Sequence, residues 1–273
     1  MAAGRPPSHY AACVSFARRE ELLATFDEAA VLYDVGRPPY PDAVFDDLFG
    51  DTGLQAPARL LEIGAGSGIA TRVLAAMGFE VVGVELSAEM VRRARKNLQA
   101  FPNVEIAHGS FESFADSSGF DAVVAFSAFH WIDRDLRYRK ALELLGAAGC
   151  IAVADARFAV PDEKLSDALE RDAVSVLGER GRQAGAPGVE GLEEELNASG
   201  FEHLAEHRYE WVVTHSAESF IQLLETVPWY LSIDRPQRRA LYDLFRRRIE
   251  RDYAGVVTVT ARGILDTARR VGN

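Results

Sequence analysis

The sequence is poor in the residues that build metal centres and disulfide frameworks. It contains two cysteines among 273 residues, and Cys13 and Cys150 are too far apart along the chain to form a redox or ligand pair. Because disulfides persist mainly in oxidising compartments, this usage favours an intracellular protein. No set of His, Asp and Glu residues has the spacing of a metal site, so we expect no metal.

Long apolar runs and an excess of basic charge are also missing. No stretch approaches the ~20 apolar residues of a membrane span, and the first residues lack the apolar core of a signal peptide. The net charge is -11, so the chain as a whole lacks the basic surface that binds phosphates. We therefore expect a cytoplasmic protein with no nucleic-acid or membrane partner.

The chain does contain enough apolar material for a large core, with 48% hydrophobic residues. From Arg59 onward, short apolar runs alternate with helical patterns, which predicts an α/β fold with a mostly parallel sheet. We expect seven strands, at 59–63, 80–85, 104–108, 121–129, 150–155, 207–214 and 256–261. We expect helices at 14–34, 42–49 (with Asp42 as its cap), 68–77, 87–99, 135–145, 161–177, 189–199, 217–226 and 235–252.

The helices between the late strands predict a cap. In open α/β sheets, ligands bind at the carboxyl ends of the strands, and we expect the cap to cover that edge. The predicted organisation is an N-terminal helical lid at 1–50, a cofactor-binding core at 51–160, and cap insertions with the last strands at 161–273.

A glycine loop follows the first predicted strand, with the sequence Glu62-Ile63-Gly64-Ala65-Gly66-Ser67-Gly68. Glycines there let the backbone turn sharply and approach a ligand closely. Glu85 ends the second strand about 20 residues later, where an acid can accept both ribose hydroxyls of an adenosine. The third glycine comes one residue earlier than in the dinucleotide fingerprint. Ala70 is nevertheless small enough to leave NAD open.

Further segments accompany the loop and Glu85. They are Leu61–Gly68, Val82–Met90, Gly109–Glu112, Phe120–Val124 and Ala128–Trp131, with Tyr33–Pro41 upstream. With these segments the chain resembles the class I S-adenosylmethionine-dependent methyltransferases over about residues 30–158. Tyr33–Pro41 is similar to the small-molecule branch that contains trans-aconitate methyltransferase. The resemblance implies a Rossmann-like sheet with helices on both faces, S-adenosylmethionine as cofactor and S-adenosylhomocysteine as product.

The resemblance also implies roles for individual residues. Glu62, Gly64, Ala65, Gly66, Ser67 and Gly68 would back the methionine moiety and the ribose, and Glu85 would hold the ribose diol. Leu86 and Met90 would lie against the adenine, with Ser110 and the backbone of Phe111 at its edge. Phe126 and Ser127 would lie near the sulfonium and the methionine amine. Tyr33 and Arg37 would close over the cofactor, with Arg37 near its carboxylate.

The acceptor side is less determined. His130, just past the fourth strand, is the candidate for catalysis or acceptor contact, although His130 and Trp131 could instead pack the cap. Trp229 and Tyr230, with Phe220 and Trp211, would line a partly apolar acceptor pocket or else form the cap core. A general base is needed only if the nucleophile is protonated. The acceptor atom stays open between O, N and C. The oligomeric state stays open between a monomer and a homodimer.

Two other functions stay open. One is an NAD(P)-dependent oxidoreductase, against which stand the short glycine spacing and the lack of a Tyr-x-x-x-Lys pair near the fourth strand. The other is a non-catalytic S-adenosylmethionine-binding regulator, since an intact cofactor loop does not establish turnover. His203, His207 and His215 receive no role.

Overall fold

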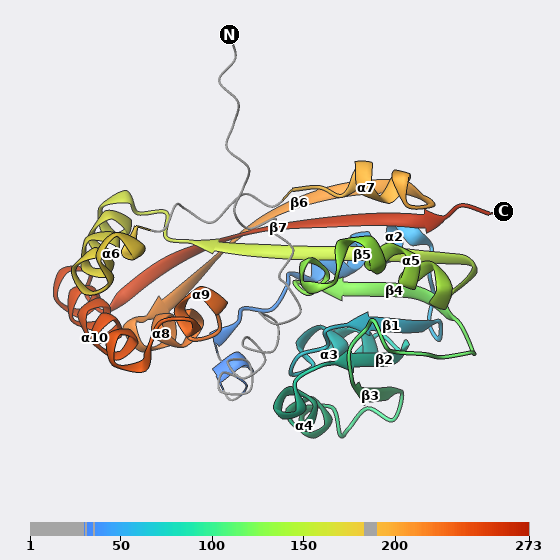
Figure 1. The fold of residues 1–273 in the computed structure, drawn as a ribbon, viewed down its shortest axis with the longest axis horizontal. Coiled ribbons are helices and arrows are strands. Elements are labelled where there is room, and N and C mark those ends of the chain that lie inside the picture. The colour runs from blue at the N-terminus through green and yellow to red at the C-terminus, as the bar shows by residue number, and fades with distance from the viewer. Residues whose placement is uncertain (1–29, 31, 35, 183–189, 273) are drawn as a thin grey trace, which may run out of the picture.

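The computed structural model describes residues 30, 32–34, 36–182 and 190–272. A seven-stranded sheet with the order β3-β2-β1-β4-β5-β7-β6 forms its centre (Figure 1). The strands are β1 (Arg59–Ile63), β2 (Glu80–Glu85), β3 (Val104–His108), β4 (Phe120–Phe126), β5 (Leu145–Ala159), β6 (Phe201–Ser216) and β7 (Val256–Arg270). The five neighbouring strands β3, β2, β1, β4 and β5 pair in parallel, and β7 runs antiparallel to β5 and β6. The predicted α/β fold with a mostly parallel sheet is confirmed.

Neighbouring residues of the central strands point into two different cores. Leu61 and Val123 pack on one face of the sheet, and Leu60 and Val124 pack on the other. The near-continuous apolar runs are what strands buried on both faces require. Three of these strands, β1, β2 and β3, have the predicted bounds.

Helices cover both of these faces, as predicted. Helices α2 (Asp42–Thr52) and α3 (Ile69–Ala76) pack on one face. Helices α5 (Arg134–Leu144) and α7 (Glu193–Ala198) pack on the other, and α4 (Ala88–Asn97) packs beside β3.

Two helix starts are capped in different ways. Ser87 caps α4, since its Oγ accepts a hydrogen bond from the Met90 N–H at 3.1 Å. The prediction for Asp42 is wrong, because Pro41 is the capping residue and Asp42 already belongs to the first turn of α2. Helix α2 also runs through the boundary that we predicted between residues 50 and 51.

The late strands are longer than predicted. Beyond Ala154, β5 no longer pairs with β4, and its last residues pair only with β7, from Asp155 opposite Ile264 to Ala159 opposite Thr260. Strands β5, β6 and β7 therefore project past the rest of the sheet (Figure 1). This projection follows from antiparallel pairing between distant segments, which the local pattern of each strand does not reveal.

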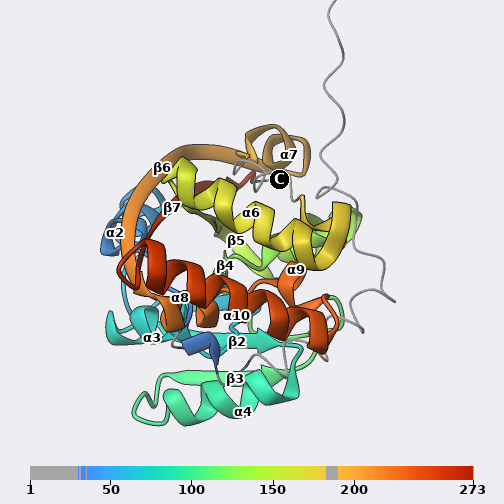
Figure 2. The same ribbon diagram turned by 90° about the vertical axis from the view of Figure 1, so that its left-hand side faces the viewer.

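The cap sits on this projection. It consists of α6 (Glu163–Leu177) between β5 and β6, and of α8 (Ala217–Leu224), α9 (Pro228–Leu231) and α10 (Arg235–Asp252) between β6 and β7. Because β5 leads directly into α6, the cap lies at the carboxyl ends of the parallel strands (Figure 1). Figure 2 looks onto the cap, with α6 and α10 side by side. The helix α9 was not predicted.

Some predictions lie outside the described residues, namely most of the helix at 14–34, Cys13, and residues 183–189 ahead of α7. In the described part of the chain, no helix is both long and apolar enough to cross a bilayer. The same residues contain no group of three or more His, Cys, Asp or Glu side chains that could hold a metal ion.

Candidate cofactor and acceptor site

A cavity of about 460 Å³ lies between the carboxyl edge of the sheet and the cap. From the sheet side it is lined by Gly64, Gly66, Glu85, Leu86, Met90, Ser110, Phe111, Phe126 and Ser127, and from the upstream segment by Tyr33 and Arg37. His130 and Trp131 line it at the junction, and Phe220, Trp229 and Tyr230 line it from the cap. The structure thus brings together most of the predicted site residues. Glu62, Ala65, Ser67, Gly68 and Trp211 lie outside this lining.

The glycine loop has a backbone that only glycine adopts without strain. Gly64, Gly66 and Gly68 have φ values of 65°, 57° and 88°, all in the left-handed region. A Cβ atom on Gly64 would lie 2.6 Å from the Cβ of Ala128, and one on Gly68 would lie 2.7 Å from Cδ1 of Leu98. The loop therefore requires glycine for its conformation and for its close packing.

Glu85 is held by the backbone at the mouth of this loop. Its Oε2 accepts a hydrogen bond from the Gly66 N–H at 2.9 Å, and its Oε1 accepts one from the Ser87 N–H at 2.8 Å. Burial raises the pKa of the carboxyl, while these bonds favour its charged form. The backbone N–H of Leu86 is a further donor to this carboxylate, so of its roughly four lone-pair sites about one is left for a ligand hydroxyl.

Glu62 lies on the other side of the loop from the cavity, in the interior. The residue is 2% exposed, and its Oε2 accepts a hydrogen bond from the Thr71 hydroxyl at 2.6 Å. Burial, together with the nearby Glu85 charge and against the Thr71 hydrogen bond, raises the pKa of Glu62 to about 8. Glu62 is therefore mostly protonated at neutral pH and ties the loop to α3.

Arg37 joins the upstream segment to the cap. Its Nη2 donates to the Thr226 carbonyl oxygen at 3.1 Å, and its guanidinium carbon lies 5.4 Å from the ring centroids of Tyr33 and Phe158. Its Nε is buried and has no hydrogen-bond partner among the described residues. Arg37 therefore has a donor free for a ligand in a cavity that it lines.

Asp34 fixes this upstream segment to α4. Its Oδ2 accepts hydrogen bonds from Arg93 Nε at 2.5 Å and Asn97 Nδ2 at 3.0 Å. Asn97 Nδ2 also donates to the carbonyl oxygen of Ser67 at 2.9 Å. Sequence reasoning missed these three residues, since no local motif announces a pairing across about sixty positions.

The chain turns sharply between β4 and His130. We predicted that this strand runs to Phe129, but it ends at Phe126 because Ser127 adopts a left-handed φ of 54°. The Ser127 N–H donates to the Ala154 carbonyl at 2.8 Å, and its hydroxyl lies 2.7 Å from the Tyr40 hydroxyl. A non-glycine residue in this region is strained, and such strain concentrates at functional sites.

His130 lies in the short 3₁₀ turn Phe129–Trp131, with its ring open to the cavity. Its Nδ1 is 3.6 Å from Asp155 Oδ2, just beyond hydrogen-bond distance. Burial under the cap lowers the pKa of His130 to about 4, Asp155 opposes this shift, and nearby arginines add to it. The side chain keeps 35% exposure and lines the cavity. His130 is therefore neutral at physiological pH.

The cap contributes aromatic side chains to the cavity. The Trp229 and Tyr230 rings meet edge to face, with centroids 4.7 Å apart. The prediction that Trp211 lines the same pocket is wrong, because its ring packs over Gly263 and lies 6.2 Å from the Tyr40 ring. The alternation of β6 turns this side chain away from the cavity.

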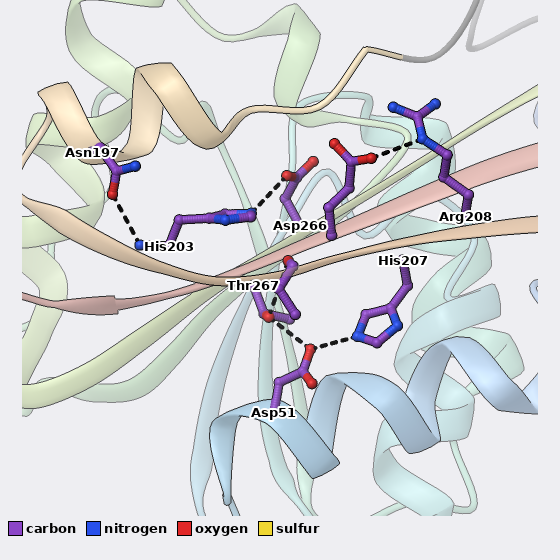
Figure 3. Close-up of polar contacts among 9 residues, drawn as sticks. Asp51, Asn197, His203, His207, Arg208, Asp266 and Thr267 are labelled. Carbon is purple, nitrogen blue, oxygen red and sulfur yellow. Dashed lines mark hydrogen bonds and ion pairs between the residues drawn. The ribbon is translucent and has the colours of Figure 1, made fainter.

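The histidines of β6 belong to a different part of the molecule. His203 Nε2 lies 3.1 Å from Asp266 Oδ1, and His207 Nε2 lies 2.9 Å from Asp51 Oδ2 (Figure 3). Thr267 also donates to Asp51, at 2.8 Å. These contacts join α2 to β6 and β7, and none of these residues lines the cavity.

Known proteins resemble this chain most strongly in its first half. The model of a methyltransferase domain family matches residues 61–152. An uncharacterised methyltransferase of Bacillus mycoides (strain KBAB4) is 32% identical over 151 residues, which are 52% of this chain and 70% of the relative. Another, from Alkaliphilus oremlandii (strain OhILAs), is 35% identical over 117 residues, which are 41% of this chain and 53% of the relative. This chain thus spans about half the length of several curated relatives that it matches.

The fold has solved counterparts as well. A structure assigned as a type II methyltransferase from Anaeromyxobacter dehalogenans matches with a TM-score of 0.61 and 21% identity, over 87% of this chain and 99% of that one. At this identity the likeness concerns the fold. Because the sequence likeness extends over more than two thirds of the Bacillus relative, this protein belongs to the class I S-adenosylmethionine-dependent methyltransferases.

Proposed function

We propose that this protein transfers the methyl group of S-adenosylmethionine to a small-molecule acceptor by in-line displacement at the sulfonium. One observation carries the proposal: a single cavity joins the glycine loop and Glu85 to His130 and the cap. The cofactor supplies an activated methyl group, so the protein has mainly to orient the nucleophile, which can lower a barrier by several kcal/mol.

In this proposal the sheet side of the cavity holds the cofactor. Glu85 binds the ribose diol, Leu86 and Met90 flank the adenine, and Arg37 meets the methionine carboxylate. The remaining predicted contacts are Tyr33, Glu62, Gly64, Ala65, Gly66, Ser67, Gly68, Ser110, Phe111, Phe126 and Ser127. The acceptor capacity left on the Glu85 carboxylate and the unpartnered Arg37 Nε support these assignments.

The cap side would hold the acceptor, with His130, Trp131, Trp229 and Tyr230 in contact with it. Residues 51–160 would then form the cofactor core, 161–273 the acceptor cap with the last strands, and 1–50 a lid. We propose a cytoplasmic protein of the branch similar to trans-aconitate methyltransferase, acting as a monomer or homodimer. The placement of Tyr33 beside Gly66 of the loop and the bond from Arg37 to Thr226 of the cap support a lid role.

Calorimetry with S-adenosylmethionine and S-adenosylhomocysteine tests the cofactor. The wild type should bind both in a saturable way, and Glu85→Ala should weaken binding by roughly 30-fold, since hydrogen bonds to a charged group contribute about 1.5–3 kcal/mol. Glu105→Ala is a matched control, because Glu105 is an exposed residue of the edge strand β3 that does not line the cavity. Binding of NADH without either sulfur ligand would favour the oxidoreductase alternative. Binding of the sulfur ligands without transfer to any acceptor would favour the regulator.

A further inference from the structure

The cap half of the cavity is mainly apolar. The cap lines it with apolar and aromatic side chains, namely Leu169, Ala173, Phe220, Leu223, Leu224, Val227, Trp229, Tyr230 and Phe245. Among the described lining residues of the cap, Glu170 is the single carboxylic acid, and it is exposed. An acceptor body in this space is therefore apolar, since a buried polar group without a partner costs free energy.

The charges around His130 are mainly positive. Arg157 on β5, Arg37 on the upstream segment and Arg137 on α5 all lower the pKa of His130, while Asp155 opposes them. The bound sulfonium would add another positive charge. This field disfavours an ammonium acceptor and stabilises an oxygen that becomes negative, while Asp155 offsets the field at His130 itself when the ring takes up a proton.

Asp155 is fixed so that it orients the His130 ring. Its Oδ1 accepts hydrogen bonds from Arg157 Nη1 at 2.7 Å and from the Ala156 N–H at 2.8 Å. Its Oδ2 faces His130 Nδ1 at 3.6 Å, a separation that can shorten when ligands fill the cavity. A proton on Nδ1 leaves the lone pair of Nε2 available on the opposite side of the ring.

We propose that the acceptor is a phenol-class molecule with an apolar body and one weakly acidic hydroxyl, and that Asp155 positions His130 to take its proton. This inference rests on the proposed methyl transfer. The hydroxyl proton moves to His130 Nε2 while the oxygen lone pair forms the new O–CH₃ bond. The S–CH₃ bond breaks, its electron pair converts the sulfonium into a neutral thioether, and the imidazolium later releases its proton to water.

A matched acceptor series tests the substrate class. The probes are para-propylphenol, para-propylbenzoate and para-propylaniline, with formation of S-adenosylhomocysteine and of the methylated product measured for each. We expect the phenol to give the methyl ether at least tenfold faster than the others react. Faster reaction of the benzoate or the aniline overturns the inference, as does no reaction of the phenol in a protein that binds S-adenosylhomocysteine. A protein that fails to bind that ligand would refute the proposed function instead.

Phenols of different acidity test the roles of His130 and Asp155. With para-propylphenol, His130→Gln should reduce kcat about 100-fold or more, as expected for a lost general base, and Asp155→Asn about tenfold. With para-nitrophenol at pH 8, which is already ionised, both losses should shrink to less than threefold. Asp135→Asn, an exposed acid of α5, is the control and should match the wild type with either phenol. Equal losses with both phenols would show a merely structural role and overturn the assignment.

Discussion

The two halves of the cavity are built in different ways. The sheet half uses backbone geometry, with left-handed glycines and a carboxylate held by backbone N–H groups. The cap half uses side-chain packing between helices that lie far apart along the chain. A backbone-built site accepts little variation, whereas packed side chains can change while the fold persists. If the proposed assignment holds, this contrast would let one half keep the cofactor while the other varies with the acceptor.

The largest expected effect comes from Gly64→Ala, which tests the backbone-built half directly. The new Cβ would collide with Ala128 at 2.6 Å, and alanine is strained at a φ of 65°. We expect S-adenosylhomocysteine to bind at least 100-fold more weakly, with about 1–3 kcal/mol lost from the free energy of unfolding. Calorimetry and urea unfolding measure the two effects. Gly50→Ala is the control, since Gly50 lies in α2 and a Cβ added there has nothing within 4 Å. Unchanged ligand binding by Gly64→Ala would contradict the contrast between the backbone-built half and the packed half.

The next effect concerns Arg37, where the two halves meet. The Arg37→Ala variant should bind S-adenosylhomocysteine about 10- to 30-fold more weakly, because it loses the proposed charge-assisted hydrogen bond to the methionine carboxylate. Methylthioadenosine lacks this carboxylate and should keep its affinity within about twofold. Arg72→Ala, at an exposed position of α3, is the matched control. Equal losses for both ligands would mean that Arg37 only holds the lid and the cap.

The third prediction uses the titration of Glu62. Its pKa is raised to about 8 in the folded protein, so between about pH 4.5 and pH 8 the folded state keeps a proton that the unfolded state has lost. Stability contributed by this group is therefore fully present below the unfolded pKa and falls as the pH rises, by at most about 1.4 kcal/mol per pH unit. Glu62→Gln should flatten this slope in urea unfolding between pH 5 and pH 8. Identical slopes for the two proteins would mean that Glu62 is charged in the interior.

The sequence predicted the sheet half well because its requirements are local. A glycine loop between a strand and a helix, and an acid at the end of the next strand, constrain the backbone over a few residues each. Gly64, Gly66 and Glu85 accordingly line the cavity as predicted. Their contacts with a bound cofactor remain a prediction.

The cap half could not be predicted to the same depth. Asp155 and Arg157 face His130 because β5 continues past the end of β4, and this depends on pairing with β7 a hundred residues later. Trp211 was misplaced because an aromatic residue suits either a pocket or a core, and only tertiary packing decides between them. Such contacts between distant segments have no signature in a short stretch of sequence.

The smallest expected effect tests whether the two halves are separable. Trp229→Leu removes an edge-to-face ring contact with Tyr230 at 4.7 Å but leaves an apolar side chain in the cap. Such contacts contribute about 0.5–1.5 kcal/mol, so the KM for para-propylphenol should rise about fivefold. Affinity for S-adenosylhomocysteine should stay within twofold, since Trp229 lies on the cap and most of the proposed cofactor contacts are on the sheet side. If the KM for para-propylphenol and the Kd for S-adenosylhomocysteine rise equally, the cap helps to hold the cofactor. The acceptor half then cannot vary independently of the half that binds the cofactor.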